Sequence, residues 1–189
     1  MNNPKPNLTR KLTAAAIVAA AYAALTIVLA PISYGAIQFR VSEALTVLPF
    51  FLPCTIWGLW IGCILANLYT GSVVDIVFGS LATLLAALFT ARYGKKGNTV
   101  KTRLLGCLMP VLFNAVIVGA VLTWGYRIQS FPDPLASFGF NALTVGLGEA
   151  LVLYLIGYTL LRQLPKIKFF REFVQRVNQE PSRAERSEP

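Results

Sequence analysis

The chain has 189 residues, of which 56 % are hydrophobic and only 13 % are charged. A soluble domain carries about 25 % charged residues, so this composition is typical of a membrane protein. The sequence contains no histidine, which excludes histidine-based acid–base catalysis, histidine metal sites and Ser-His-Asp or Cys-His nucleophiles. The cysteines lie in apolar surroundings without a C-x-x-C pair, so we interpret Cys54, Cys63 and Cys107 as packing residues and predict neither a disulfide nor a metal site.

Basic residues dominate the charge, which is +9 overall. Most of the 17 Lys and Arg residues fall in three segments, which are 5–11, 92–103 and the chain from Arg162 onward. Basic residues collect in the cytoplasmic segments of membrane proteins, and they are also attracted to anionic lipid headgroups. The charge therefore predicts membrane topology, and it argues against a nucleic-acid partner.

We predict an all-α bundle of six membrane-spanning helices, in a membrane domain that covers 12–162. The first apolar stretch has about the 20 residues needed to cross a roughly 30 Å hydrocarbon core. Pro49 and Pro53 divide the next stretch into two short helices, because a helix cannot continue through both prolines. The predicted helices are 12–30, 41–52, 55–69, 72–91, 104–124 and 138–161.

Six crossings return both ends of the chain to one side, and the positions of the basic segments then predict that this side is the cytoplasm. Residues 1–11 form a cytoplasmic tail in this topology. Residues 163–189 form a second, charged tail, which we expect to be partly disordered, above all after Gln175. The loops 31–40, 69–72 and 126–137 lie on the outer side.

Polar side chains recur inside or beside the apolar stretches, and we predict that they line a solute-binding pocket, because ionisable groups in membrane helices are costly and commonly functional. Four of them, at or near the predicted outer mouth, are Gln38, Arg40, Glu43 and Asp75, and three further along the chain are Asn114, Asn141 and Glu149. Glu149 is the strongest candidate because it lies about eleven residues into its helix, near the bilayer midplane. Asn141 shares a helix face with it.

Simpler roles remain open for several of these residues. Glu149 is also able to form an interhelical hydrogen bond with Asn114. Asp75 has capping-box spacing from Ser72 at the start of a helix. Arg40 and Glu43 are three residues apart and can form an ion pair.

Small residues form two parallel rows on the first predicted helix, at a spacing that lets another helix approach closely. The rows are Ala15, Ala19 and Ala23, and Ala16, Ala20 and Ala24. Each row is able to pack inside the chain or against another subunit, and we predict that at least one docks a partner. Gly58, Gly62 and Ala66 form a similar ridge, which we assign to internal packing.

Three motifs resemble the QueT family. They are Gly35-x-Ile-Gln-Phe-Arg-x-Ser-Glu-Ala-Leu, Gly62-Cys-x-x-Ala-Asn67 and Asp75-Ile-x-Phe-Gly-x-Leu-Ala-Thr83. The resemblance implies a substrate-binding S component of an energy-coupling factor (ECF) transporter in the bacterial cytoplasmic membrane. It implies docking through the first helix onto a transmembrane coupling subunit that is driven by two ATPases. The chain itself lacks a G-x-x-x-x-G-K-[ST] phosphate loop.

The resemblance also implies a ligand, a queuosine precursor such as 7-aminomethyl-7-deazaguanine or queuine, and no cofactor. A carboxylate at Glu149 or Glu43 would accept from the two adjacent donors of a guanine-like edge. Gln38, Asn114, Asn141 or Arg40 would donate to the 6-oxo group, Asp75 would attract a cationic aminomethyl group, and Phe39 would stack on the ring.

Other functions remain open at this stage. A self-sufficient secondary transporter would use Glu149 and Asp75 as proton or cation sites, although the chain shows no inverted repeat. An S component for another vitamin-like solute would share the same fold. A membrane enzyme would need a second catalytic group near Glu149, and a purely structural adaptor would need only the alanine rows.

Overall fold

The computed structural model of the chain describes residues 6–33 and 39–178. These residues form helices and turns without a β-strand, which confirms the predicted all-α fold. The main elements are α1 (Pro6–Val28), α2 (Ala30–Ser33), the 3₁₀ helix η1 (Val41–Phe50), α3 (Thr55–Leu68), α4 (Ser80–Gly94), α5 (Val100–Ala120), α6 (Pro134–Val152), α7 (Tyr158–Gln163) and α8 (Lys168–Asn178). Short π-helical segments, η2 (Asp75–Gly79), η3 (Val121–Gly125) and η4 (Leu153–Gly157), adjoin α4, α5 and α6, and the 3₁₀ turn η5 (Leu164–Lys166) precedes α8.

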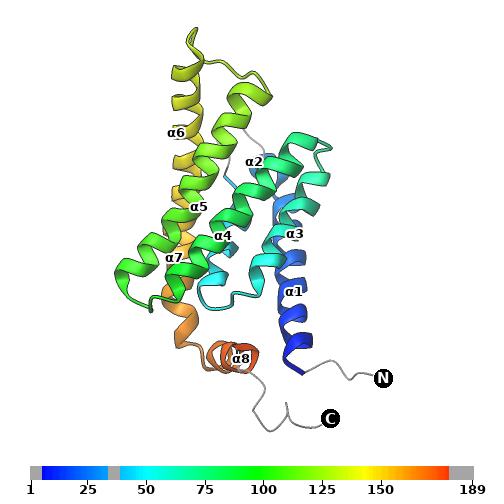
Figure 1. Cartoon of the computed structure of the whole chain (residues 1–189), viewed down its shortest axis with the longest axis vertical. Coiled ribbons are helices and arrows are strands. Elements are labelled where there is room, and N and C mark those ends of the chain that lie inside the picture. Colours follow the sequence, from blue (N-terminus) through cyan, green and yellow to red (C-terminus); the bar gives the residue numbers. More distant parts are fainter. Residues whose placement is uncertain (1–5, 34–38, 179–189) are drawn as a thin grey trace.

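The long helices run up and down between two ends of the bundle (Figure 1). The start of α1, the turn between α4 and α5, and α8 lie at the lower end, here called the basic end. The connections from α3 to α4 and from α5 to α6 lie at the upper end, here called the loop end. The described parts of the three basic segments therefore share one end of the molecule, as predicted. The assignment of that end to the cytoplasm stays a prediction.

Four helical stretches are long and apolar enough to cross a membrane. They are Leu8–Val28, Asp75–Gly94, Val100–Gly125 and Pro134–Lys166. Val41–Phe50 and Thr55–Leu68 are apolar but shorter. All six segments that we predicted as helices are helical. Length and composition support four membrane crossings, so the predicted count of six crossings stays a prediction.

The short η1 segment has 3₁₀ geometry over 10 residues, although such runs are usually three or four residues long. A 3₁₀ helix rises about 2.0 Å per residue, so this segment spans roughly 20 Å where an α-helix would span roughly 15 Å. Pro49 lies inside it, and the Thr46 hydroxyl donates to the Glu43 carbonyl oxygen at 2.5 Å. The tighter helix lets a short, Pro-containing segment reach further through the bundle.

Helices α1 and α3 approach closely because small residues meet at their contact. A Cβ atom at Gly58 would lie 2.2 Å from the Ala15 carbonyl oxygen, and one at Gly62 would lie 2.7 Å from that of Ala19. Ala19 and Ala23 are buried. The row Ala15, Ala19 and Ala23 therefore packs inside the chain and does not suit partner docking. The other row, Ala16, Ala20 and Ala24, is exposed.

The charged C-terminal tail contains a helix, α8. We had predicted only that this tail, residues 163–189, is partly disordered. Its Phe170 ring packs edge-on against Phe51, with centroids 5.8 Å apart. Val177 is fully buried, and the Asn178 side-chain amide donates to the Phe51 carbonyl oxygen at 3.0 Å. The helix continues past Gln175 because an apolar face docks on the end of η1, while residues 179–189 lie outside the described part of the chain.

The close contact of α1 with α3 predicts that Gly58→Ala destabilises the fold. The added methyl group would collide with backbone atoms of Ala15, and overpacking of this kind costs about 1–3 kcal/mol. Gly139→Ala is the matched control, since nothing lies within 4 Å of its Cβ position and alanine is favoured over glycine in a helix. Thermal unfolding in detergent should rank Gly58→Ala below both wild type and the control, and equal midpoints for all three would contradict the packing.

Candidate functional site

The buried charges of the bundle gather around Glu43, in the first turn of η1. Glu43 is 0 % exposed, and its Oε1 atom accepts a hydrogen bond from the Tyr22 hydroxyl of α1. Thr83 of α4 donates to the same oxygen at 3.4 Å. Arg40 Nη1 lies 4.0 Å from it, so the ion pair that we considered for these two residues is present. Three segments of the chain thus fix one oxygen of this carboxylate.

Glu149 of α6 lies next to this group. It is 3 % exposed and interacts electrostatically with Glu43 and Arg40. Asn114 of α5 is equally buried, and its side chain lies beside both carboxyl groups. We call Arg40, Glu43, Asn114 and Glu149 the carboxylate cluster, and four of the residues predicted for the site are therefore brought together.

The carboxylate cluster has polar atoms to spare. Glu43 Oε2, Asn114 Nδ2 and Glu149 Oε2 are buried, and among the described residues none of them makes a hydrogen bond of good geometry, although the Asn114 side chain lies beside both carboxyl groups. Buried polar atoms are normally paired, because an unpaired one costs about 1–3 kcal/mol. Two carboxyl groups beside one guanidinium also leave an excess of acceptor oxygens. The cluster is therefore chemically matched to a solute that brings several hydrogen-bond donors.

Asp75 lies apart from the carboxylate cluster, at the start of η2 near the loop end. Its carboxylate accepts from the Tyr126 hydroxyl at 2.5 Å, and its backbone amide donates to the Ser72 hydroxyl at 3.3 Å. Burial, followed by the hydrogen bond to Asp75, raises the pKa of Tyr126, so its hydroxyl stays protonated and remains the donor at neutral pH. The capping role of Ser72 is thus present, and Asp75 joins the two connections of the loop end.

Asn141 has a structural role in the same region. Its side-chain amide donates to Thr123 Oγ1 at 2.9 Å and to the Ile128 carbonyl oxygen at 3.0 Å. These bonds attach α6 to η3 and to the connection that follows η3. The shared helix face with Glu149 is real, but the Asn141 amide nitrogen is committed to this link. Gln38, the remaining predicted site residue, lies outside the described residues.

Two residues that hold the site were missed by the sequence reasoning. Tyr22 is the one hydroxyl-bearing aromatic residue in the alanine-rich part of α1, and it is fully buried. Thr83 ends the third motif, yet it reads as an ordinary helix residue. A polar group at each of these positions is a weak signal, because hydroxyl groups in helices commonly bond to their own backbone. Only the packing of α1 and α4 around η1 reveals their function.

Two open pockets lie elsewhere, at the basic end, with volumes of about 540 and 970 Å³. Neither includes a member of the carboxylate cluster. We do not assign the solute to either pocket, because the buried polar atoms converge at the carboxylate cluster and not at these pockets.

A bundle of apolar helices around buried ionisable residues is typical of a multi-pass membrane protein that handles a polar solute. The chain belongs to the QueT transporter family, which matches residues 12–166. This match confirms the resemblance found in the sequence and places the protein among transporters rather than enzymes.

One curated relative is the "Queuosine precursor transporter QueT" of Lactococcus lactis subsp. cremoris (strain MG1363), which is 44 % identical over 82 residues. The matched region covers 42 % of this chain and 48 % of the relative. The match therefore spans about half the length of that relative. No solved structure matches the chain.

The geometry predicts that Tyr22→Phe weakens the fold by about 1–3 kcal/mol, because the substitution removes a hydrogen bond to a buried carboxylate. Tyr154→Phe is the matched control, since the Tyr154 hydroxyl makes an exposed bond of 3.3 Å to the Leu104 carbonyl oxygen. Thermal unfolding of both variants in detergent should show a loss for Tyr22→Phe alone. A loss of equal size in both variants would show that the Tyr22–Glu43 bond has no special weight.

Proposed function

We propose that the protein is the solute-binding S component of an ECF transporter and captures a queuosine precursor, a 7-deazaguanine, for import across the bacterial cytoplasmic membrane. Membership of the QueT transporter family supports import as the activity. The name of the Lactococcus relative supports the class of solute. The carboxylate cluster is the observation that carries the proposal, because it supplies buried acceptors where a donor-rich base would need them.

A 7-deazaguanine has the complementary edge. Its N1–H and exocyclic amino groups are adjacent donors, which one carboxylate can accept together, and charge-assisted hydrogen bonds of this kind are the strong ones. Glu149 fits this role best, because Tyr22, Thr83 and Arg40 already occupy Oε1 of Glu43. Glu43 Oε2 would then accept a further donor.

Amide and guanidinium groups would complete recognition of the base. Asn114 lies between the two carboxylates, so its Nδ2 atom would donate to the 6-oxo group, with Arg40 as the alternative donor. Phe39 precedes Arg40 and would stack on the ring. Asp75 is held by Tyr126 at the loop end and would meet a cationic aminomethyl group on entry. Of the other donors predicted for the 6-oxo group, Asn141 is held by its bonds to Thr123 and Ile128, and Gln38 lies outside the described residues.

Energy would come from partner subunits. The chain contains no G-x-x-x-x-G-K-[ST] phosphate loop, so an ATP-driven import needs ATPases on other chains and a transmembrane subunit that couples them. The exposed row Ala16, Ala20 and Ala24 offers a flat helix face on which such a subunit would dock. The buried row beside it would hold α1 in place during docking.

Binding by the isolated chain tests the proposal. Calorimetry in nanodiscs with queuine, 7-aminomethyl-7-deazaguanine, guanine and riboflavin should show one-to-one binding that favours a deazapurine, without ATP or partners. Glu149→Gln and Glu43→Gln should each weaken that binding by at least about tenfold, because each removes a charged acceptor. Glu172→Gln is the control, because Glu172 pairs with exposed Lys168 and Arg176 on α8.

Unchanged affinity in both site variants, with the fold intact, would contradict the role of the carboxylates. No binding of any deazapurine by folded wild-type protein would remove the queuosine assignment. Uptake into liposomes driven by a proton gradient alone would support a second candidate, a self-sufficient secondary transporter, for which the neighbouring Glu43 and Glu149 would serve as the proton site.

The docking row predicts a different phenotype. Ala20→Leu should reduce co-purification with the coupling subunit by about tenfold or more, because a large side chain keeps helices apart, while solute affinity stays unchanged. Ala136→Leu is the control at another exposed helical alanine. Equal co-purification of both variants with the coupling subunit would place the docking surface elsewhere.

A further inference from the structure

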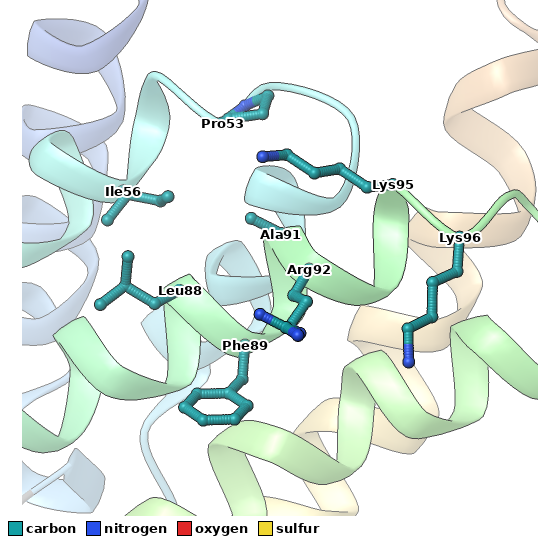
Figure 2. Close-up of a pocket in the computed structure, with 8 residues that line it drawn as sticks. All are labelled: Pro53, Ile56, Leu88, Phe89, Ala91, Arg92, Lys95 and Lys96. Atoms are coloured by element: carbon teal, nitrogen blue, oxygen red, sulfur yellow. The ribbon is translucent and has the colours of Figure 1, made fainter.

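A pocket at the basic end combines apolar walls with cations, and nothing in the transport of the solute makes use of it. It has a volume of about 540 Å³ and lies between the start of α3 and the end of α4 (Figure 2). We propose that this pocket binds an anionic phospholipid of the adjoining leaflet, with the lipid phosphate on Lys95 and Arg92 and an acyl chain along Leu88 and Phe89.

The pocket has two chemically distinct parts. Ile56, Leu88 and Phe89 form its apolar walls, while Arg92 and Lys95 bring cations to it. In Figure 2 the Lys95 side chain extends towards Pro53, and the Arg92 side chain points towards the Phe89 ring. None of the eight lining residues is acidic, so the lining itself supplies no counter-charge for these cations.

The third cation of the pocket, Lys96, is partly engaged. Lys96 Nζ lies 5.0 Å from the centre of the Tyr93 ring, and its side chain lies to one side of the other cations in Figure 2. It therefore adds positive potential at the rim, while Arg92 and Lys95 are the groups placed to contact a phosphate.

The depth of the pocket favours a lipid over a free anion. The candidate membrane span Asp75–Gly94 ends between Arg92 and Lys95, which is the level where a hydrocarbon core gives way to headgroups. Leu88 and Phe89 lie one turn deeper and are 45 % and 41 % exposed. A phospholipid presents a phosphate and an acyl chain at these two levels, whereas free phosphate satisfies only the cations.

Net charge selects among lipids. Zwitterionic phosphatidylcholine carries its own cation beside the phosphate, and a trimethylammonium group gains nothing from a lining without acids. Phosphatidylglycerol keeps its negative charge, and basic pockets between membrane helices are suited to such headgroups. The proposal therefore commits to an anionic phospholipid.

Native mass spectrometry and thermal unfolding of the full chain test the site with phosphatidylglycerol, phosphatidylcholine and inorganic phosphate. Phosphatidylglycerol should bind and raise the unfolding midpoint, and the other two should not. The double variant R92Q/K95Q should bind phosphatidylglycerol at least tenfold more weakly. The control K101Q/K166Q removes the same charge from positions outside the pocket and should bind like wild type.

Three results would overturn the proposal. Equal losses in the two double variants would reduce the effect to overall charge, and equal stabilisation by inorganic phosphate would assign the pocket to a free anion. Indifference of the wild type to phosphatidylglycerol would leave no lipid site. Because Arg92 and Lys95 are exposed, we expect the variants to fold, and their unfolding midpoints in phosphatidylcholine can be compared with that of the wild type. K95Q alone supplies a second, milder variant.

Discussion

Two carboxylates buried side by side in an apolar bundle are the constraint on which the rest of the structure depends. A charge removed from water is stable only when it is paired and hydrogen-bonded. Glu43 meets this condition through Tyr22, Thr83 and Arg40, which together satisfy one of its oxygens. The other oxygen and Glu149 face the Asn114 amide. The protein thus holds one oxygen of Glu43 itself and leaves Oε2 of Glu43 and Oε2 of Glu149 as acceptors for the solute.

The packing of the helices serves this arrangement. Gly58 and Gly62 let α3 lie directly on the backbone of α1, which brings Tyr22 against η1 and Thr83. The 3₁₀ geometry of η1 carries Glu43 into the bundle in a segment of only 10 residues. At the loop end, Tyr126 and Asp75 join the connections above the cluster. Small residues and a tight helix thus determine where the buried groups meet, and the Tyr126 hydroxyl links the connections of the loop end through Asp75 and Ser72.

Much of this was predictable, and the exceptions have physical reasons. Hydropathy and proline positions predicted the six helical segments, and the cost of polar and charged groups in lipid singled out Glu43, Asn114 and Glu149. Neither pattern shows which elements touch, so the roles of Tyr22 and Thr83 were missed, and the alanine row that faces α3 was not distinguished from the exposed one. The helix α8 was missed because its apolar face packs on parts of the chain far away in sequence, among them Phe51 after η1. Gln38, in the most specific motif, lies outside the described residues.

The most direct measurement is an experimental structure of the chain with a bound 7-deazaguanine, in nanodiscs. The carboxylate cluster predicts density for one base between η1, α5 and α6, with its N1 and exocyclic amino edge on Glu149 and with Asn114 and Glu43 within hydrogen-bonding distance. A base bound at the basic end, or on the loop end without contact to either carboxylate, would contradict the assignment of the buried pair to solute recognition.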